Sequence, residues 1–302
     1  MEAATASSLH CCTWIFPEKI GRRPNGFLRF SRNCREGRTL RFNWRDLQWS
    51  NASIHPRPVS LEISCSYNNS PASAFESENR CASLDEALVL KKKAEEVIPC
   101  LDGRCIYLVG MMGSGKTTVG KMLSEALGYS FFDSDKLVEQ ATGETSVAEI
   151  FKNYSESFFR DNESEVLRKL SLMHQLVVAT GGGAVVRPIN WKYMRHGITV
   201  WLDVPLEALA RRIAAVGTDS RPLLHDESGD AYTKALMRLS LLSEERGKAY
   251  ANADTRVSLL NISAKLRHCD VCEITPTAIA IEALIQIENF LSNDGVATAT
   301  SP

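Results

Sequence analysis

Eight consecutive residues combine glycines with a lysine and a threonine at a spacing that suits chemistry on phosphates. They fit the pattern G-x-x-x-x-G-K-[ST] and are followed by Thr118: Gly110, Met111, Met112, Gly113, Ser114, Gly115, Lys116 and Thr117. The glycines let successive backbone N–H groups face a polyphosphate at a helix N-terminus. Lys116 offers a point charge to the β- and γ-phosphates of ATP, and the Thr117 hydroxyl is placed to ligate Mg²⁺. The alternative is a glycine-rich turn that binds nothing.

Two carboxylates, Asp133 and Asp135, follow the short apolar run 129–132. One of them can hold the hydration shell of Mg²⁺, and the other can accept a hydrogen bond from a substrate hydroxyl. The alternative is a pair of loop acids that face solvent.

Three consecutive glycines, Gly181, Gly182 and Gly183, come just after the apolar run 176–179. Because they carry no Cβ, a backbone N–H can approach a ligand closely there. A plain flexible turn is the alternative, and the apolar run directly before it favours a site.

Arginines provide the remaining candidate chemistry. Arg160 and Glu163 are spaced as neighbours on a helix, so that the carboxylate can orient the guanidinium; a surface ion pair is the other interpretation. Residues 217–226 form a polar, turn-rich segment, as active-site lids often do. Arg221 in this segment can stabilise charge on a transferring phosphoryl group.

Apolar spacing predicts the elements that must position these residues. The predicted strands are residues 105–109, 129–132, 176–179, 198–202 and 255–260. The predicted helices are residues 83–96, 119–127, 146–153, 158–170, 188–195, 206–215, 232–250 and 277–291. Their alternation predicts an α/β fold of three layers, with helices on both faces of a central parallel sheet of about five strands. In such a sheet, ligands bind at the carboxyl ends of the strands.

The composition excludes several classes of protein. The 302 residues are 44% hydrophobic and 24% charged, as in a soluble globular protein. A net charge of −1 predicts no general attraction to nucleic acid or to an anionic membrane, and no apolar run has the length of a membrane span. Nine irregularly spaced cysteines do not resemble a secreted disulfide scaffold, so we expect free thiols.

The first sixty residues differ from the rest of the chain. They hold ten Lys and Arg against four acids, so the remainder carries about −7. This Arg-, Ser- and Ala-rich composition, with no continuous apolar core, predicts an organellar transit peptide without structure; a nucleic-acid arm is the alternative. Residues 61–100 are expected to form a linker and a first helix, and residues 293–302 a disordered tail.

Six motifs in this order resemble those of shikimate kinase, a small family within the nucleoside-monophosphate-kinase-like fold. The similarity spans about residues 106–260, and its motifs are GMMGSGKT, FFDSD, FFR-x-x-E, TGGG, SRPLL and ERGKAY. It implies a P-loop kinase domain with a lid at residues 101–292, which uses ATP and Mg²⁺ to phosphorylate the 3-hydroxyl of shikimate in the aromatic amino acid precursor pathway. The basic leader makes the chain similar to a plant, plastid-targeted form.

The resemblance also implies a role for each matched residue. Residues 110–117 would cradle the ATP phosphates, with Thr117 on Mg²⁺ and Asp133 contacting that ion through water. Asp135 would bind ring hydroxyls and act as the base, while Arg160 and Arg246 would clamp the shikimate carboxylate. The three glycines would border the ring and the γ-phosphate, and Arg221 would close with the lid.

The sequence leaves some matters open. The arginine that stacks on adenine is Arg211 or Arg212, and we take Arg212 as the candidate. A gluconate kinase is the runner-up enzyme, and a relative that has lost its chemistry is the non-enzymatic alternative. Residues 263–273 look like an insertion of unknown role, whose Cys269 and Cys272 form either inert thiols or a regulatory disulfide. The oligomeric state is not evident from the sequence.

Overall fold

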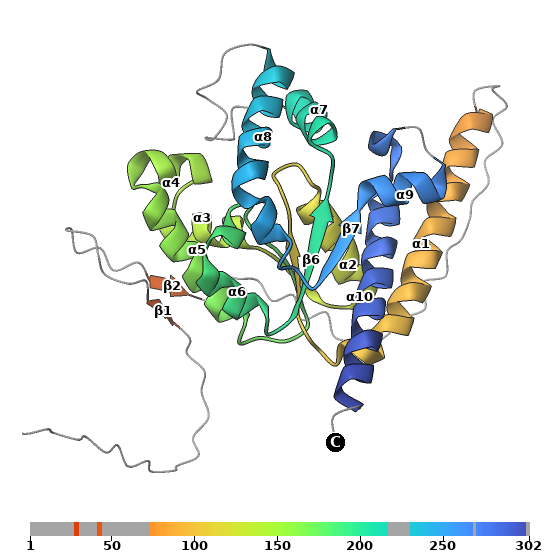
Figure 1. Cartoon of the computed structure of the whole chain (residues 1–302), viewed down its shortest axis with the longest axis horizontal. Helices are drawn as coiled ribbons and strands as arrows, with labels where there is room; N and C mark the ends of the chain where they lie inside the picture. The colour runs from red at the N-terminus through yellow and green to blue at the C-terminus, as the bar shows by residue number, and fades with distance from the viewer. Residues whose placement is uncertain (1–26, 30–40, 44–72, 217–229, 268–269, 300–302) are drawn as a thin grey trace, which may run out of the picture.

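The computed structural model describes residues 27–29, 41–43, 73–216, 230–267 and 270–299 (Figure 1). In the leader, the short strands β1 (Phe27–Arg29) and β2 (Arg41–Asn43) pair antiparallel. Residues 61–72 of the predicted linker, the lid with Arg221, and Cys269 lie outside the described residues. The transit peptide therefore stays a prediction.

Five parallel strands form the central sheet, in the order β4-β5-β3-β6-β7. Their bounds are Ile106–Val109 for β3, Ser130–Asp133 for β4, Leu176–Ala179 for β5, Ile198–Asp203 for β6 and Thr255–Ser258 for β7. The chain order reverses at β3, which pairs with β5 on one side and β6 on the other. The crevice at such a reversal is where open α/β sheets bind ligands.

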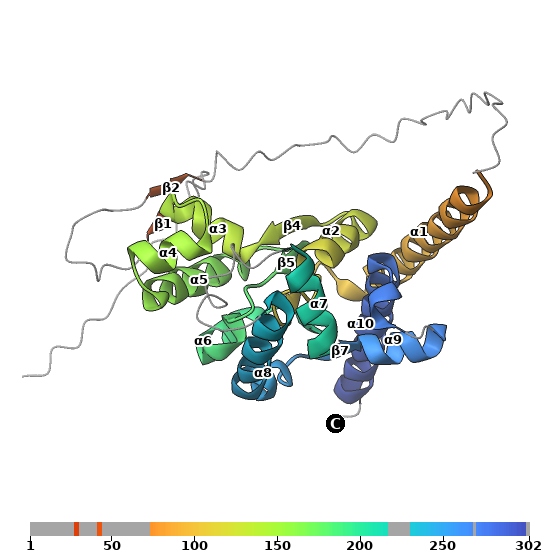
Figure 2. The same cartoon turned by 90° about the horizontal axis from the view of Figure 1, so that it is seen from above.

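Helices cover both faces of the sheet, which confirms the predicted three layers. Figures 1 and 2 show α2 (Lys116–Leu127) and α10 (Pro276–Ala299) against one face, with α1 (Ser73–Leu101) packed beyond them. On the other face lie α5 (Glu156–Leu170), α6 (Pro188–Met194) and α8 (Ala231–Tyr250). None of the helices in the described part of the chain is long and apolar enough to cross a bilayer.

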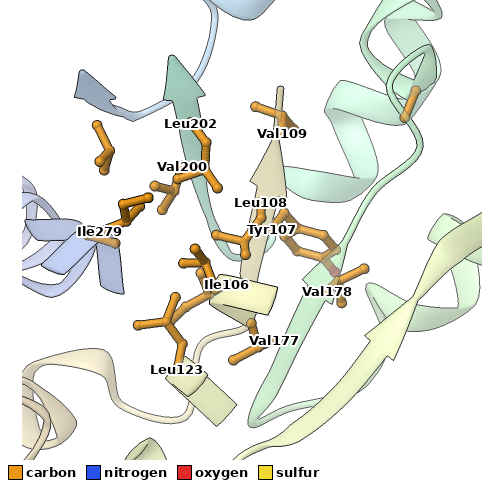
Figure 3. Packing of buried hydrophobic residues seen from close by; sticks show 14 of the residues in the cluster. Ile106, Tyr107, Leu108, Val109, Leu123, Val177, Val178, Val200, Leu202 and Ile279 are labelled. Carbon is orange, nitrogen blue, oxygen red and sulfur yellow. The ribbon is translucent and has the colours of Figure 1, made fainter. Parts of the chain in front are cut away.

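The core lies between the sheet and these helices. All four residues of β3 and all four of β5 are buried, as expected of central parallel strands. Successive side chains of β3 point to opposite faces, so Ile106 packs toward Leu123 of α2 and Ile279 of α10, while Tyr107 points the other way (Figure 3). Because β3 and α2 are both packed in the core, the loop between them (residues 110–115) has a fixed position.

Several predicted boundaries are wrong. Helix α1 begins at Ser73, whereas the sequence was interpreted as linker up to about residue 80 and as helix from residue 83. Helix α3 (Ser134–Thr142) begins directly after β4, where the sequence was interpreted as a loop, because the Asp133 side chain caps its first N–H groups. Helix α1 continues through Pro99, since Val97 and Leu101 are buried in the core. Strand β7 ends at Ser258, and the apolar residues after it begin α9 (Leu259–Leu266). Helix α10 extends to Ala299, beyond the expected end at residue 291, so the prediction of a disordered tail is wrong for residues 293–299.

The remaining short elements connect the sheet to the site. They are α4 (Val147–Asn153), which is capped by Ser146, α7 (Leu206–Val216), and the single turns η2 (Ala184–Val186) and η4 (Val271–Glu273).

Replacement of Gly197 by alanine tests how tightly the sheet is packed. A Cβ at this position would overlap the Cys105 carbonyl, which accepts the backbone bond of Ile198. We expect Gly197→Ala to lower the free energy of unfolding by about 3 kcal/mol, measured from the urea midpoint at unchanged slope. Gly247→Ala in α8, where a Cβ meets nothing within 4 Å, is the control and should stabilise by up to about 1 kcal/mol. Wild-type stability of Gly197→Ala would contradict the packing described here.

Candidate active site

The loop between β3 and α2 curls around the ammonium group of Lys116. The Lys116 Nζ atom donates to the carbonyl oxygens of Gly110 at 2.8 Å and Met111 at 2.9 Å, and to Ser114 Oγ at 3.4 Å. Gly110 has a φ of 148°, and a Cβ there would lie 2.8 Å from the Leu202 carbonyl oxygen. The loop therefore needs glycine at this position, and it places a buried cation at the N-terminus of α2.

Thr117 and Asp133 meet at the edge of this loop. The Thr117 hydroxyl donates to Asp133 Oδ2 at 2.9 Å. The other oxygen, Asp133 Oδ1, accepts the backbone N–H of Asp135 at 3.1 Å and of Lys136 at 3.4 Å, which fixes the carboxylate at the start of α3. A hydroxyl and a carboxylate are oxygen ligands of the kind that Mg²⁺ prefers, so the two predicted metal residues fit this ion.

A cavity of about 360 Å³ opens beside the loop, at the carboxyl ends of β4 and β5. The predicted substrate residues among its lining are Asp135, Arg160, Gly181, Gly182, Gly183 and Arg246. They come from α3, α5, the segment after β5, and α8, so the fold brings together residues that are more than a hundred positions apart. Met112 of the phosphate loop lines the same cavity, which joins the two sites.

The glycines after β5 admit charged groups to this cavity. A Cβ on Gly181 would overlap Asp135 Oδ1 and Glu163 Oε1, and a Cβ on Gly183 would overlap the guanidinium of Arg160. The Gly181 N–H donates to the Ser134 hydroxyl at 2.9 Å, which fixes the segment against α3. The structure thus favours the interpretation of these glycines as a site over that of a plain turn.

Asp135 carries the most perturbed carboxylate of the cavity. Burial is the largest cause of a raised pKa of Asp135; together with the nearby charges of Glu163 and Asp133, and against the opposing effect of Lys116 and Arg160, it brings this pKa to about 7. Its Oδ1 atom is buried and has no hydrogen-bond partner among the described residues. Asp135 as a residue is half-buried, so the buried, unpartnered part of its carboxylate is Oδ1; a carboxylate with such an atom and a pKa near neutrality is typical of a functional site.

Glu163 orients Arg160, as its spacing predicts. The Nη1 atom of Arg160 donates to Glu163 Oε2 at 3.2 Å, and Nη2 donates to Glu156 Oε1 at 3.0 Å. Glu163 is fully buried, and this burial raises its pKa although Arg160 and Arg246 oppose the rise. The alternative of a surface ion pair is therefore wrong.

A second cavity, of about 530 Å³, lies on the other side of the phosphate loop. Arg212 lines it and donates to the Gly113 carbonyl at 3.3 Å, whereas Arg211 is exposed and pairs with Asp270 at 2.7 Å. Of the two candidate arginines, the structure brings Arg212 to the loop. The phosphate loop lines the same cavity with five residues that were predicted to bind the nucleotide: Gly113, Gly115, Lys116, Thr117 and Thr118.

Sequence reasoning missed part of the lining of this second cavity. Cys272, Ile274, Pro276 and Ile279 line the cavity, so the end of the apparent insertion faces the loop rather than solvent alone. Cys272 is a free thiol, and its CxxC partner lies outside the described residues. No periodicity in the sequence links residues 272–279 to the loop, because the contact arises only when α10 packs on α2.

Sequence reasoning also missed Tyr250, whose hydroxyl donates to the Gly182 carbonyl at 2.6 Å. Its position four residues after Arg246 on a predicted helix was the available signal, since that spacing places both side chains on one face. Arg221 lies outside the described residues, so its role stays a prediction.

Comparison with known proteins identifies the family. The model of the shikimate kinase family matches residues 112–278, more than half of the chain. The chain belongs to the shikimate kinase family.

Among relatives of this shikimate kinase family member, "Shikimate kinase, chloroplastic" from Solanum lycopersicum is 60% identical over 96% of this chain and 97% of its own length. "Shikimate kinase 1, chloroplastic" from Arabidopsis thaliana is 55% identical over 97% of each chain. The solved shikimate kinase from Acinetobacter baumannii in complex with shikimate is 32% identical, with a TM-score of 0.52 over 66% of this chain and 98% of its own.

The raised pKa of Asp135 has a consequence for stability. From the ordinary value of 3.8 up to about 7, the folded protein keeps a proton that the unfolded chain has released, so wild-type stability falls as pH rises through this window. Asp135→Asn removes the titration, and its stability relative to wild type should increase by about 3 kcal/mol between pH 5 and pH 8, measured by urea unfolding at both values.

The exposed carboxylate Asp85 on α1 provides the control for this measurement. Asp85→Asn should change the same difference by less than about 0.5 kcal/mol. An Asp135→Asn protein whose relative stability does not depend on pH would show that this carboxylate is solvated.

Proposed function

We propose that this protein transfers the γ-phosphoryl group of ATP to the 3-hydroxyl of shikimate, giving shikimate 3-phosphate and ADP in the chloroplast. The observation that carries the proposal is one cavity in which two buried guanidinium groups and the half-buried carboxylate of Asp135 adjoin a phosphate-binding loop. Relatives that are 55–60% identical over nearly the whole chain bear the name shikimate kinase, chloroplastic, which supports both the substrate and the location.

Arg160 and Arg246 are suited to bind the carboxylate of the acceptor. Both guanidinium groups line the cavity and both are largely buried, so their attraction for an anion is weakly screened. A planar guanidinium matches a carboxylate through two parallel hydrogen bonds. Because Glu156 and Glu163 hold Arg160 from one side, the bound acid meets a cation that is already oriented.

Asp135 is suited to bind the acceptor hydroxyl and take its proton. Its carboxylate lines the cavity and can accept a hydrogen bond from the hydroxyl, and a pKa of about 7 lets the carboxylate accept the proton at neutral pH. Phosphoryl transfer requires little covalent chemistry from the protein, so most of the acceleration comes from position and charge. Lys116 supplies positive charge where the phosphates of ATP would lie on the loop.

Thr117 and Asp133 are the residues that would hold Mg²⁺, which neutralises charge on the phosphates when it is bound. Arg212, which lines the second cavity, would contact the adenine of ATP. Closure of the lid with Arg221 would exclude water and so limit wasteful hydrolysis of ATP.

The test of the proposal is ADP release by the purified protein with shikimate, with gluconate and with no acceptor. We expect rapid release only with shikimate, because the two guanidinium groups and Asp135 match a hydroxylated ring acid. Asp135→Asn should keep ATP binding and lose about 10²–10⁴-fold in turnover, as when a general base is removed. Lys116→Ala should lose both ATP binding and turnover.

Equal ADP release with gluconate would replace shikimate by the runner-up acceptor. Release that does not depend on any acceptor would reduce the site to an ATPase. Normal turnover by Asp135→Asn would withdraw its role as base.

The pH dependence of kcat/KM for shikimate should follow the titration of Asp135. The base must be deprotonated, so kcat/KM should fall about tenfold per pH unit below about 7 and level off above it. Glu163→Gln removes a negative charge that raises the pKa of Asp135, so the midpoint should move to lower pH. A profile that stays flat from pH 5.5 to 8 in the wild-type protein would contradict the assignment.

A further inference from the structure

The carbonyl oxygen of Gly182 accepts hydrogen bonds from two side chains of α8. Gly182 lines the cavity of about 360 Å³ that contains Asp135, Arg160 and Arg246, which we call the acid cavity. The Tyr250 hydroxyl donates to the Gly182 oxygen at 2.6 Å, and Arg246 Nη1 donates to the same atom at 3.3 Å. The first distance is at the short end for an O–H···O bond, and the second is beyond the usual range for N–H···O. Tyr250 is therefore the main partner of this carbonyl, and Arg246 is a secondary one.

The ring of Tyr250 is fixed from behind. Tyr250 is only 2% exposed, and its ring stacks on Trp201 of β6 with centroids 5.8 Å apart and planes 14° apart. The guanidinium of Arg256 lies 4.8 Å from the centre of the Trp201 ring, and its Nε atom donates to Asp203 at 3.0 Å. Two strands of the sheet thus determine where the phenol hydroxyl lies.

Gly182 is held on its opposite side by the phosphate loop. A Cβ on Gly182 would lie 3.5 Å from the Met112 backbone nitrogen and 3.7 Å from the Gly110 carbonyl oxygen. The Gly182 peptide, to which Tyr250 donates, is therefore packed between the phosphate loop and α8. It has little room to move toward the loop.

Arg246 needs Tyr250 in order to remain available for an anion. Arg246 is buried and lines the cavity, and its Nε atom has no hydrogen-bond partner among the described residues. The Gly182 carbonyl is only partly exposed, so loss of its main donor would be costly, and the remaining side-chain donor is the guanidinium of Arg246. Without the Tyr250 hydroxyl, Arg246 would shorten its bond to Gly182 and turn away from the cavity.

We propose that Tyr250 is a positioning residue, whose hydroxyl occupies the Gly182 carbonyl so that Arg246 is presented to the carboxylate of the acceptor acid. This inference rests on the proposed function, in which Arg246 binds that carboxylate. Tyr250 touches neither substrate in this account; it acts on the acid through Arg246 and Gly182.

Tyr250→Phe tests the proposal, because it removes the hydroxyl and keeps the ring that stacks on Trp201. We expect the Kd of shikimate, measured by calorimetry, and its KM to rise about tenfold. The KM of ATP should change less than twofold, since the loop residues that hold the phosphates are untouched. A merely structural role of Tyr250 would instead affect both substrates together.

Tyr107→Phe is the matched control. The Tyr107 hydroxyl is also buried, but it has no hydrogen-bond partner among the described residues, and the residue does not line the acid cavity. Its removal should leave the Kd of shikimate and the KM of ATP within twofold of wild type.

A double-mutant cycle with Arg246→Lys separates action through Arg246 from an independent effect. Lysine cannot reproduce the guanidinium fork, so Tyr250→Phe should change the Kd of shikimate less than twofold in that background. The proposal is overturned by an unchanged Kd in the single Tyr250→Phe variant, by equal losses for ATP and shikimate, or by full additivity with Arg246→Lys. A wild-type protein that neither binds nor phosphorylates shikimate would instead overturn the proposed function, and this inference with it.

Discussion

The site depends on the close contact of charged side chains with the backbone of Gly181 and Gly183, directly after β5. Asp135, Glu163 and Arg160 occupy the space that side chains at positions 181 and 183 would fill. Any residue larger than glycine would push these groups outward into solvent, where water would screen their charges. The same glycine segment packs on the phosphate loop, so that acid cavity and nucleotide loop share one wall.

The free protein leaves this charge cluster incompletely satisfied. Asp135 Oδ1, Glu163 Oε1 and Arg246 Nε are buried atoms without hydrogen-bond partners among the described residues. Unsatisfied buried polar groups cost stability, and the neighbouring arginines offset only part of the cost of burying two carboxylates. A ligand that brings a carboxylate to the arginines and a hydroxyl to Asp135 would supply partners to these groups, although not to Glu163 Oε1. The instability of the free site is thus a physical source of its selectivity for a hydroxylated acid.

Much of the fold was predictable because its signals are local. The strand at residues 176–179 was predicted with its observed bounds, since a continuous apolar run ending in glycines has few other interpretations. Helix α3 was missed because its start follows β4 with no linker, and its cap, Asp133, was interpreted only as a ligand. The passage of α1 through Pro99 depends on packing against α10, which no local pattern shows.

The site residues that belong to sequence motifs were predictable one by one. Those that reach the site only through the packing of distant segments were less predictable. Arg211 and Arg212 are adjacent, and only the packing of α7 shows that Arg212 faces the phosphate loop. Tyr250 and the wall at residues 272–279 act through contacts between distant segments, which a single sequence does not reveal. Arg221 and the lid stay predictions.

The ionisation of Asp135 in the free protein tests the account most directly, because it reports burial, the nearby acids and the glycine wall together. Carbon NMR of protein labelled at aspartate carboxyls would follow it, with the resonance assigned by its absence in Asp135→Asn. We expect one aspartate carboxyl that titrates at a pH of about 7. Titration of that resonance near pH 4, as for an exposed aspartate, would show that the carboxylate lies in water and that the cavity does not exist in this form.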